Sequence, residues 1–193
     1  MNKNKIMIIG CGGIGSYLIS LLDRANRMGE TKKMLYDITV YDPDVVETKN
    51  LSYQNFDKDH IGLSKPEALA QNYKFNAQPY KVLTPSQIQG YDLVICCADN
   101  LDVRKMLYKS EVRWLDLRAQ GRAGLLVSSD EDPKLYTTLT TGPDGSFSCQ
   151  GDNWDRSNQG VHFTHVAVAG YGAQWVQRFF SGDYTPKHIV VSA

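Results

Sequence analysis

The stretch GCGGIGS contains three glycines, Gly10, Gly12 and Gly15, in the spacing G-x-G-x-x-G. Glycines in such a turn let the backbone approach a phosphate group, and the helix that follows offers unpaired N–H donors at its N-terminus. Asp42 closes a later apolar stretch, where its carboxylate can accept hydrogen bonds from ribose hydroxyls. These residues predict a nucleotide site, and taken alone they suit a dehydrogenase and an adenylate-binding enzyme equally.

A nucleotide turn needs a strand before it and a helix after it, and the sequence pattern supplies both. The apolar run 6–10 is typical of a strand buried on both faces, and Ile14, Leu18 and Leu22 recur at helical spacing. Further helices are expected at 65–75, 101–111 and 162–180, and further strands at 37–42, 80–84, 91–100, 112–119, 123–129, 134–140 and 188–193.

This alternation predicts an α/β fold of Rossmann-like type, with a mainly parallel sheet, antiparallel additional strands and helices on both faces. Ligands of such sheets sit outside the carboxyl ends of the strands. We expect one domain over residues 1–193, with an exposed insertion at 25–36 and a long polar loop at about 142–160. The two stretches after Gly121 form the expected antiparallel return.

Composition excludes several classes of protein. The 21 Lys and Arg residues balance the 21 Asp and Glu residues, so no global basic field attracts nucleic acid or an acidic membrane. No apolar run is long enough to span a membrane, and glycines interrupt the apolar N-terminal stretch as no signal peptide would. The four cysteines contain no C-x-x-C pair, so neither zinc nor a disulfide framework is expected. We expect a cytoplasmic protein.

The stretch DPDVVETKNLSYQNF at 42–56 separates the two nucleotide-binding classes. Its pattern D-x-D-x-V-x-x-x-N-L-x-x-Q, followed by IGLSK at 61–65 and CADN-x-x-x-R at 97–104, resembles the signature of the ThiF/MoeB family. Members of that family are adenylating domains related to ubiquitin-activating enzymes. The likeness in motifs runs through Arg104, and the small size resembles compact plasmid and phage members such as the PRTRC-system ThiF proteins.

The resemblance implies a reaction and a set of roles. The family joins the C-terminal carboxylate of a small ubiquitin-like or sulfur-carrier protein to ATP, which gives an acyl adenylate and pyrophosphate. Asp99 would hold Mg²⁺, Lys65 would place a charge on the phosphates and Asn50 would donate a hydrogen bond to them. The remaining nucleotide-binding residues would be Gly10, Gly12, Gly13, Gly15, Asp42, Asp44 and Asn100. A homodimer, or a heterodimer with a related subunit, is also implied.

Each role has a structural alternative. Asp99 could cap the helix after it, and Asn50 could be a turn residue. Arg104 matches an arginine common in the family, and a structural ion pair explains it equally well. Cys149 lies in the long polar loop, where the family carries a covalent acceptor of the acyl group, but it could also be incidental. His60, His162, His165 and His188 show no metal-ligand spacing, so we interpret them as structural.

Position 53 departs from the family pattern. The family has N-L-x-R-Q with an arginine on the ATP phosphates, whereas this chain has NLSYQ with Tyr53. A phenol cannot neutralise phosphate charge at pH 7. We also expect no N-terminal extension, from which some relatives offer an arginine across the dimer interface. Candidates for the missing charge are Arg24, Arg27, Arg118, Arg122 and an arginine of a partner chain.

Three classes of function therefore stay open. The first is an adenylyltransferase that uses ATP and Mg²⁺. The second is a non-catalytic subunit with the adenylating fold that binds a partner. The third is an NAD(P)-dependent oxidoreductase, which the glycine turn alone suggests and which leaves the N-L and G-x-x-K elements without a role.

Overall fold

The structure is a computed structural model that describes residues 3–29, 36–138, 149–150 and 160–192. One seven-stranded sheet runs through the described part in the order β3-β2-β1-β4-β5-β6-β7. The strands are β1 Asn4–Ile9, β2 Tyr36–Tyr41, β3 Asn76–Gln78, β4 Leu93–Cys96, β5 Trp114–Gln120, β6 Ala123–Ser128 and β7 His188–Ser192. β1 to β5 pair in parallel, and β6 pairs antiparallel with both β5 and β7.

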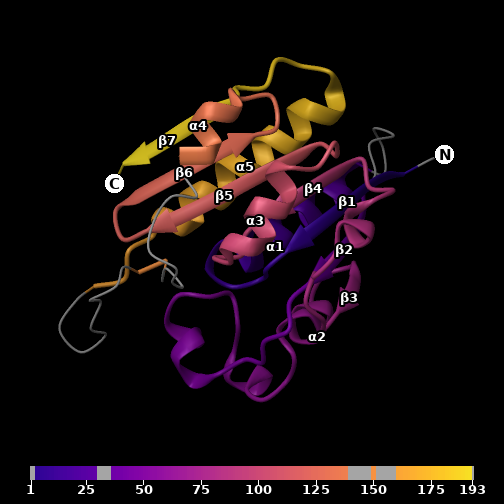
Figure 1. The fold of residues 1–193 in the computed structure, drawn as a ribbon. Coiled ribbons are helices and arrows are strands. Elements are labelled where there is room, and N and C mark those ends of the chain that lie inside the picture. Colours follow the sequence, from indigo (N-terminus) through magenta and orange to yellow (C-terminus); the bar gives the residue numbers. More distant parts are fainter. Residues whose placement is uncertain (1–2, 30–35, 139–148, 151–159, 193) are drawn as a thin grey trace.

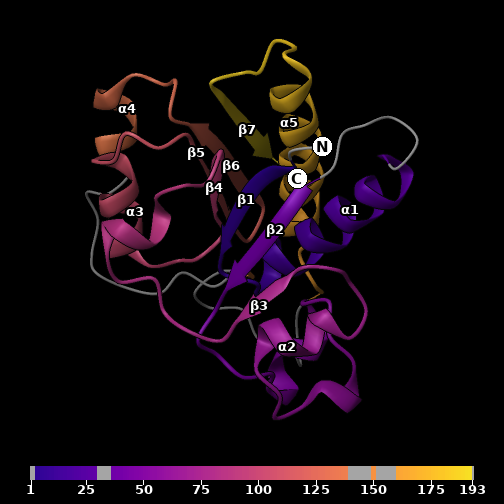
Figure 2. The ribbon, with the colours of Figure 1, turned by 90° about the vertical axis from the view of Figure 1, so that its right-hand side faces the viewer.

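Helices cover both faces of the sheet, as the sequence predicts (Figures 1 and 2). α1 (Gly13–Gly29) and α5 (Thr164–Ser181) pack together on one face. α3 (Leu101–Tyr108) and α4 (Pro133–Thr138) lie on the other. Each face has its own apolar core, and both cores draw side chains from β1, which is buried from Ile6 to Ile9, and from the fully buried strand β4. The expected mainly parallel α/β fold with antiparallel additions is thus confirmed.

The segment between β2 and β3 forms a separate lobe beside the sheet (Figure 1). It contains two short 3-10 helices, η1 (Thr48–Ser52) and η2 (Lys58–His60), and the short helix α2 (Lys65–Ala70). A further 3-10 helix, η3 (Pro85–Ile88), precedes β4. α2 ends at Ala70, so the helix expected over 65–75 covers only the first half of that range.

Two expected strands are wrong. Residues 80–84 form no strand, because β3 ends at Gln78 and the Tyr80 N–H turns back to donate to the Gln78 carbonyl over 2.8 Å. Residues 133–138 form α4 where a strand was expected at 134–140. The Asp132 side chain accepts the Lys134 N–H over 2.8 Å, and Pro133 suits the first turn of a helix, so local helix-start signals outweigh the β-like composition.

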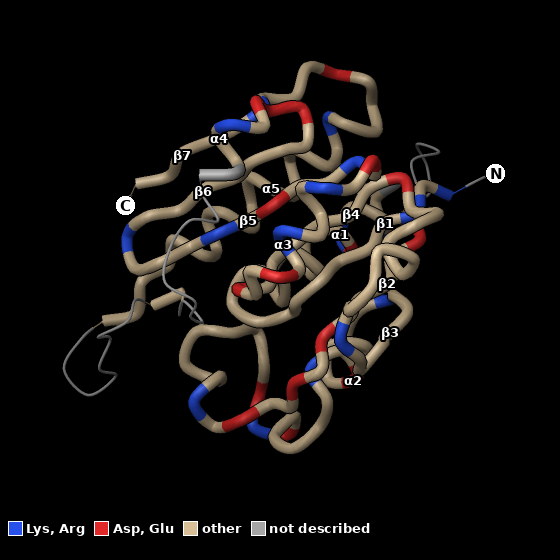
Figure 3. The backbone as a smooth tube through the Cα atoms, in the orientation of Figure 1, with Lys and Arg blue, Asp and Glu red and all other residues tan. Residues whose placement is uncertain are grey.

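Other expectations fall partly outside the described residues. α1 continues to Gly29, so the first residues of the expected insertion at 25–36 are helical. The expected loop at 142–160 lies outside the described residues except for Cys149, Gln150 and Gly160. Lys and Arg positions alternate with Asp and Glu positions along the described backbone (Figure 3). No helix in these described segments is both long and apolar enough to cross a bilayer.

Candidate nucleotide-binding site

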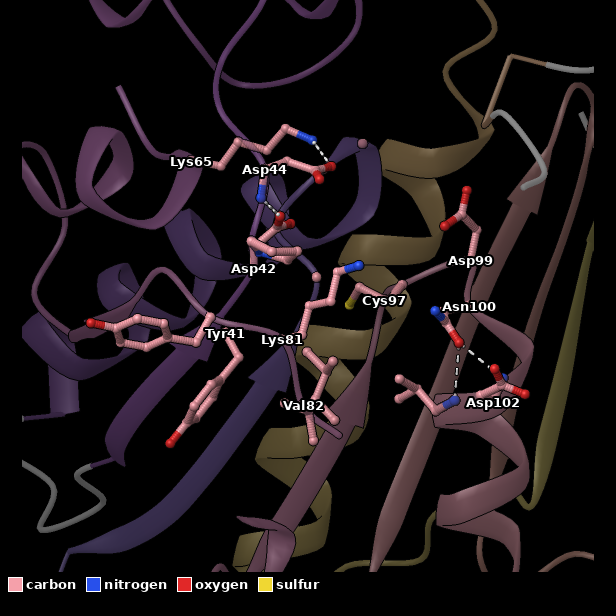
Figure 4. Close-up of a pocket in the computed structure, with 18 of the residues that line it drawn as sticks. Tyr41, Asp42, Asp44, Lys65, Lys81, Val82, Cys97, Asp99, Asn100 and Asp102 are labelled. Carbon is pink, nitrogen blue, oxygen red and sulfur yellow. Dashed lines mark hydrogen bonds and ion pairs between the residues drawn. The ribbon is translucent and has the colours of Figure 1, made fainter. Parts of the chain in front are cut away.

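The carboxyl ends of β1, β2 and β4 meet at one edge of the sheet, and backbone hydrogen bonds continue past the strands to hold them there. The Gly10 N–H donates to the Tyr41 carbonyl over 2.8 Å, and the Cys97 N–H donates to the Ile9 carbonyl over 2.8 Å. A cavity of about 920 Å³ opens above this edge (Figure 4). Ligand clefts commonly have volumes of a few hundred to about 1,000 Å³, so a nucleotide fits.

The glycine turn forms the floor of the cavity. Gly10 has a φ of 90°, and a Cβ there would lie 2.7 Å from the Ala98 nitrogen. A Cβ on Gly15 would lie 2.0 Å from the Gly10 carbonyl oxygen. Both positions therefore require glycine, and the N-terminus of the 17-residue helix α1 approaches the cavity as a phosphate-binding turn demands.

Asp42 lies at the wall formed by the end of β2 and is almost fully buried. Its Oδ2 accepts the Cys11 N–H over 2.8 Å, and its Oδ1 accepts the Asp44 N–H over 2.9 Å. Burial raises the pKa of the Asp42 carboxyl, although nearby Lys65 and the two N–H donors act in the opposite direction. The predicted ribose acceptor is thus already anchored to the glycine turn.

Lys65 and Asp44 form an ion pair on the same wall. Lys65 begins α2, and an isolated antiparallel bridge between Val45 and Ser64 brings it to the D-P-D segment. Its Nζ lies 2.9 Å from the Asp44 Oδ2, and the Lys65 side chain is buried whereas that of Asp44 is exposed. Burial lowers the pKa of Lys65, but the carboxylates of Asp42 and Asp44 outweigh burial and raise it, so the ammonium keeps its charge inside the wall.

η1 and the residues just after it contribute two amides to the cavity. The Oδ1 of buried Asn50 accepts the Glu47 N–H over 2.8 Å, so the amide NH₂ is the end suited to a ligand. Asn50 thus takes the turn role and stays in the cavity lining. Gln54 was assigned no role from the sequence, and it lines the cavity beside Gly12. Among the described residues, its buried Oε1 has no hydrogen-bond partner. An orphaned buried acceptor at a cavity indicates a ligand donor.

Asp99 and Asn100 stand on the opposite wall, after β4 (Figure 4). The Asn100 Oδ1 accepts the N–H groups of Asp102 and Val103 over 2.9 and 3.2 Å, so Asn100 is the N-cap of α3. The capping role considered for Asp99 is thus filled by Asn100. Both residues line the cavity.

The family model described as ThiF family matches residues 1–186. This chain belongs to the ThiF family. It is similar to the adenylyltransferase and sulfurtransferase UBA4 of Lodderomyces elongisporus, with 31% identity over 98% of this chain and 43% of that protein. It is also similar to the adenylyltransferase and sulfurtransferase MOCS3 of Xenopus laevis, with 30% identity over 55% of this chain and 24% of that protein. The chain spans less than half the length of these curated relatives.

Solved structures share the fold. A crystal structure of E. coli MccB with ATP superposes with a TM-score of 0.67 and 16% identity, over 98% of this chain and 60% of that one. A crystal structure of PaaA superposes with a TM-score of 0.64 and 14% identity, over 98% of this chain and 60% of that one. The likeness supports a ThiF-type Rossmann-like fold across the described part of the chain.

The position of the ThiF-family arginine is filled by Tyr53, which lines the cavity at the end of η1. The Tyr53 ring meets the buried His165 ring edge-on, with 6.2 Å between centroids. Four arginines were candidates to replace the missing positive charge: Arg24, Arg27, Arg118 and Arg122. None of them is among the described residues that line the cavity. Arg27 pairs with Asp23, and Arg118 pairs with Asp116.

Arg104 of the CADN-x-x-x-R motif does not line the cavity. It is buried and pairs with the fully buried Asp116, with 3.2 Å between Nε and Oδ1. Asp116 also accepts the Arg118 Nε–H over 2.8 Å and the Tyr108 hydroxyl over 2.5 Å. The structure therefore favours the ion-pair interpretation, in which Arg104 fixes α3 to β5 below the Asp99 wall.

Cys149 lies against the glycine turn. A Cβ on Gly13 would lie 2.9 Å from the Cys149 Sγ and 3.6 Å from the His165 ring, and the Ile14 N–H donates to the thiol. Burial and then the Asp99 carboxylate raise the pKa of Cys149 to about 11, despite the Ile14 donor. The thiol is thus a lining group of the cavity, in its protonated form at neutral pH. Cys96 ends β4 and is fully buried, whereas Cys97 follows the strand, packs against the core and also lines the cavity.

The donor set at Asp99 fits magnesium held largely by phosphate. No group of three or more His, Cys, Asp or Glu side chains in the described segments could hold a metal ion by itself. Mg²⁺ in nucleotide sites commonly takes one or two carboxylates and completes its shell with phosphate oxygens and water. A single carboxylate facing the cavity satisfies that requirement, so the residues present are compatible with the Mg²⁺ role predicted for Asp99.

Proposed function

We propose that this chain is an ATP-dependent adenylyltransferase that activates the C-terminal carboxylate of a small ubiquitin-like or sulfur-carrier protein or peptide. One observation carries the proposal: the glycine turn, Asp42, Lys65 and Asp99 come from four separated segments and meet around one cavity. Membership of the ThiF family and the similarity to proteins named adenylyltransferases support it. E. coli MccB, which shares the fold, has been crystallised with ATP and with AMPCPP and MccA.

The reaction needs no general base, because a carboxylate is already a nucleophile. One carboxylate oxygen attacks the α-phosphorus of ATP and forms the new P–O bond. The bond between the α-phosphorus and the bridging oxygen to the β-phosphorus breaks, and pyrophosphate leaves with that electron pair. The products are an acyl adenylate and pyrophosphate, so the site must supply positioning and charge neutralisation.

The described residues divide this work between two walls. Asp42 accepts the ribose hydroxyls, and the helix N-terminus at Gly12 and Gly13 receives phosphate oxygens. Lys65 and the Asn50 NH₂ contact the phosphates, with Asp44 holding the Lys65 ammonium in place. On the other wall Asp99 would hold Mg²⁺, which supplies charge neutralisation when bound, and Asn100 positions the Asp99 loop.

Two further features belong to the proposal. We expect the chain to act as a homodimer or with a related subunit, since Phe163, just before α5, and Tyr171 on α5 are exposed. Cys149 is close enough to the glycine turn to line the adenylate site, but its raised pKa makes it a poor nucleophile in the free protein. Covalent capture of the acyl group on Cys149 therefore requires a change in its surroundings when the adenylate forms.

Pyrophosphate–ATP exchange, measured with purified protein, Mg²⁺ and carrier proteins that end in Gly-Gly, tests the activity. We expect exchange that depends on both the carrier and Mg²⁺. The exchange rate of the Asp99→Ala variant should be at least about a hundredfold lower than that of the parent, because the variant removes the carboxylate proposed to hold Mg²⁺ at the phosphates. Asp102→Ala, which removes a neighbouring carboxylate of the same cavity wall, is the matched control and should keep most of the rate.

The second candidate is a non-catalytic subunit with the adenylating fold. Tyr53 favours it, because Tyr53 stands where the family pattern has an arginine and no arginine lines the cavity among the described residues. This candidate predicts carrier or partner binding without exchange, even when carriers and a related subunit are supplied. NAD(P)H titration, followed by nicotinamide fluorescence, tests the oxidoreductase alternative, for which we expect no saturable binding.

A further inference from the structure

The cavity has to neutralise a triphosphate without the arginine of the family pattern. In the described part of the chain, the cationic side chains that line it are lysines: Lys49, Lys65 and Lys81. Two of them already have carboxylate partners. The Lys65 Nζ lies 2.9 Å from Asp44, and the Lys49 Nζ lies 2.7 Å from Glu47. Each would divide its charge between its partner and a ligand.

Among the described residues, Lys81 has no such carboxylate partner, unlike the other two lysines. None of the ion pairs among the described residues includes it. In Figure 4 its side chain extends into the cavity, and the ammonium points into the space between Asp42 and Asp99. An ammonium in that space stands between the wall that holds the ribose acceptor and the wall proposed to hold Mg²⁺.

The segment that carries Lys81 is fixed, although it is not the strand expected at 80–84. The Gln87 amide donates to the Lys81 carbonyl over 3.3 Å, and its Oε1 accepts the N–H groups of Leu83 and Thr84 over 2.8 and 3.0 Å. Val82 is buried in the core on the α3 face of the sheet. Because Val82 points into the core, its neighbour Lys81 is directed toward the cavity.

We propose that Lys81 supplies the phosphate-neutralising charge that the family pattern places at position 53. Its ammonium contacts the phosphates of ATP, and Tyr53 takes no part in charge neutralisation. The flexible Lys81 side chain reaches the phosphates from the wall after β3, whereas an arginine at position 53 would reach them from the end of η1. This inference rests on the proposed function, since it assumes that the cavity binds ATP.

Isothermal titration with ATP, AMP and adenosine tests the assignment. In Lys81→Met, which keeps the length of the side chain and removes its charge, the Kd for ATP should rise about tenfold to a hundredfold. The Kd for adenosine should stay unchanged, because adenosine carries no phosphate. Lys109→Met, at an exposed lysine that ends α3 outside the cavity, is the matched control and should bind all three ligands as the parent does.

A rescue experiment separates a charge effect from a loss of structure. The double variant Lys81→Met/Tyr53→Arg should recover most of the ATP affinity, and Lys81→Arg should retain it. An unchanged Kd for ATP in Lys81→Met would overturn the assignment, as would an equal loss of adenosine binding. If Lys49→Met shows the selective ATP loss instead, the charge belongs to η1 and the assignment is wrong. A parent protein that binds neither ATP nor adenosine would refute the proposed function itself, and this inference with it.

Discussion

The Asp42 Oδ2 accepts the backbone N–H of Cys11 over 2.8 Å, and this bond ties the end of β2 to the glycine turn that follows β1. The same carboxylate accepts the Asp44 N–H. Asp42 thus shapes the floor of the cavity before any nucleotide arrives. The carboxylate proposed to bind the ribose is therefore also a structural group of the glycine turn.

Asp42→Ala should therefore lower stability as well as nucleotide affinity. The variant leaves two N–H groups without their acceptor, and each buried unsatisfied donor costs about 1–3 kcal/mol. We expect a loss of about 2–4 kcal/mol in the free energy of unfolding, measured by urea titration. Asp183→Ala, at an exposed carboxylate outside the cavity, should change stability little. Equal stability of Asp42→Ala and the parent would show that the turn does not need this bond.

Gly12 and Gly15 should respond differently to the same added methyl group. A Cβ on Gly15 would overlap the Gly10 carbonyl, so Gly15→Ala should unfold the turn and give a poorly folded protein. A Cβ on Gly12 would meet Gln54 at 3.8 Å, an ordinary contact. Gly12→Ala should fold with a melting temperature close to that of the parent and bind ATP more weakly, because its methyl group occupies the phosphate position. Calorimetry and ATP titration on both variants measure the contrast.

Asp116 should be the most sensitive carboxylate for stability. It is fully buried and is shared by two guanidinium groups, those of Arg104 and Arg118. Asp116→Ala leaves both cations in or near the core without a partner, so we expect a loss of about 3–5 kcal/mol in chemical unfolding. The control is Asp130→Ala, which breaks the exposed pair with Arg113 and should cost less than about 1 kcal/mol. A small effect at Asp116 would mean that the two arginines find other acceptors.

Cys96 should make the protein less stable at high pH. Burial, and then nearby Asp116, raise the pKa of Cys96 to about 12 from an ordinary value of 9.0. Between these values the unfolded chain releases a proton that the folded chain keeps, so the stability present below pH 9 is lost as pH rises toward 12. Cys96→Ala should reduce the slope of unfolding free energy against pH in that window by up to about 1.4 kcal/mol per unit.

Val94→Ala provides the matched control for the Cys96 variant. Val94 is fully buried on the same strand and has no ionisable group, so its truncation lowers stability without changing the slope. Equal slopes for Cys96→Ala and the parent would place the alkaline sensitivity in other groups.

The sequence carries enough information for the central strands and the glycine turn, because the apolar run 6–10 and the glycine spacing are local signals. The close contact at Gly15 is with the Gly10 carbonyl in the same turn, whereas Gly10 itself approaches Ala98, which follows β4 and lies far away in the sequence. The errors at 80–84 and 134–140 arose where a β-like composition competes with other contacts. At 80–84, the Gln87 side chain accepts the backbone N–H groups of Leu83 and Thr84, which a neighbouring strand would otherwise accept.

The site itself was only partly predictable. Asp42 was selected from its place at the end of the second strand, and Lys65 and Asp99 because the family resemblance marks their positions; the structure brings all three around one cavity. Lys81 has no local signature, since the cavity wall is assembled from segments far apart in the chain. Gln54 is part of the N-L-x-x-Q pattern, and that pattern was the available signal. The Arg104–Asp116 pair depends on how α3 packs on β5, which no spacing in the sequence encodes.

Because backbone hydrogen bonds continue past β1 and β4, we expect the cavity floor to open on a slower timescale than the wall formed by η1. The amide hydrogens of Gly10 and Cys97 are held between central strands, so they should exchange with deuterium only when the whole sheet opens. The amide of Tyr53 is held by a single short turn of η1 at the surface, and it should exchange much sooner. The floor can stay closed while the η1 wall opens and recloses many times, which gives a ligand a way in that leaves the sheet undisturbed.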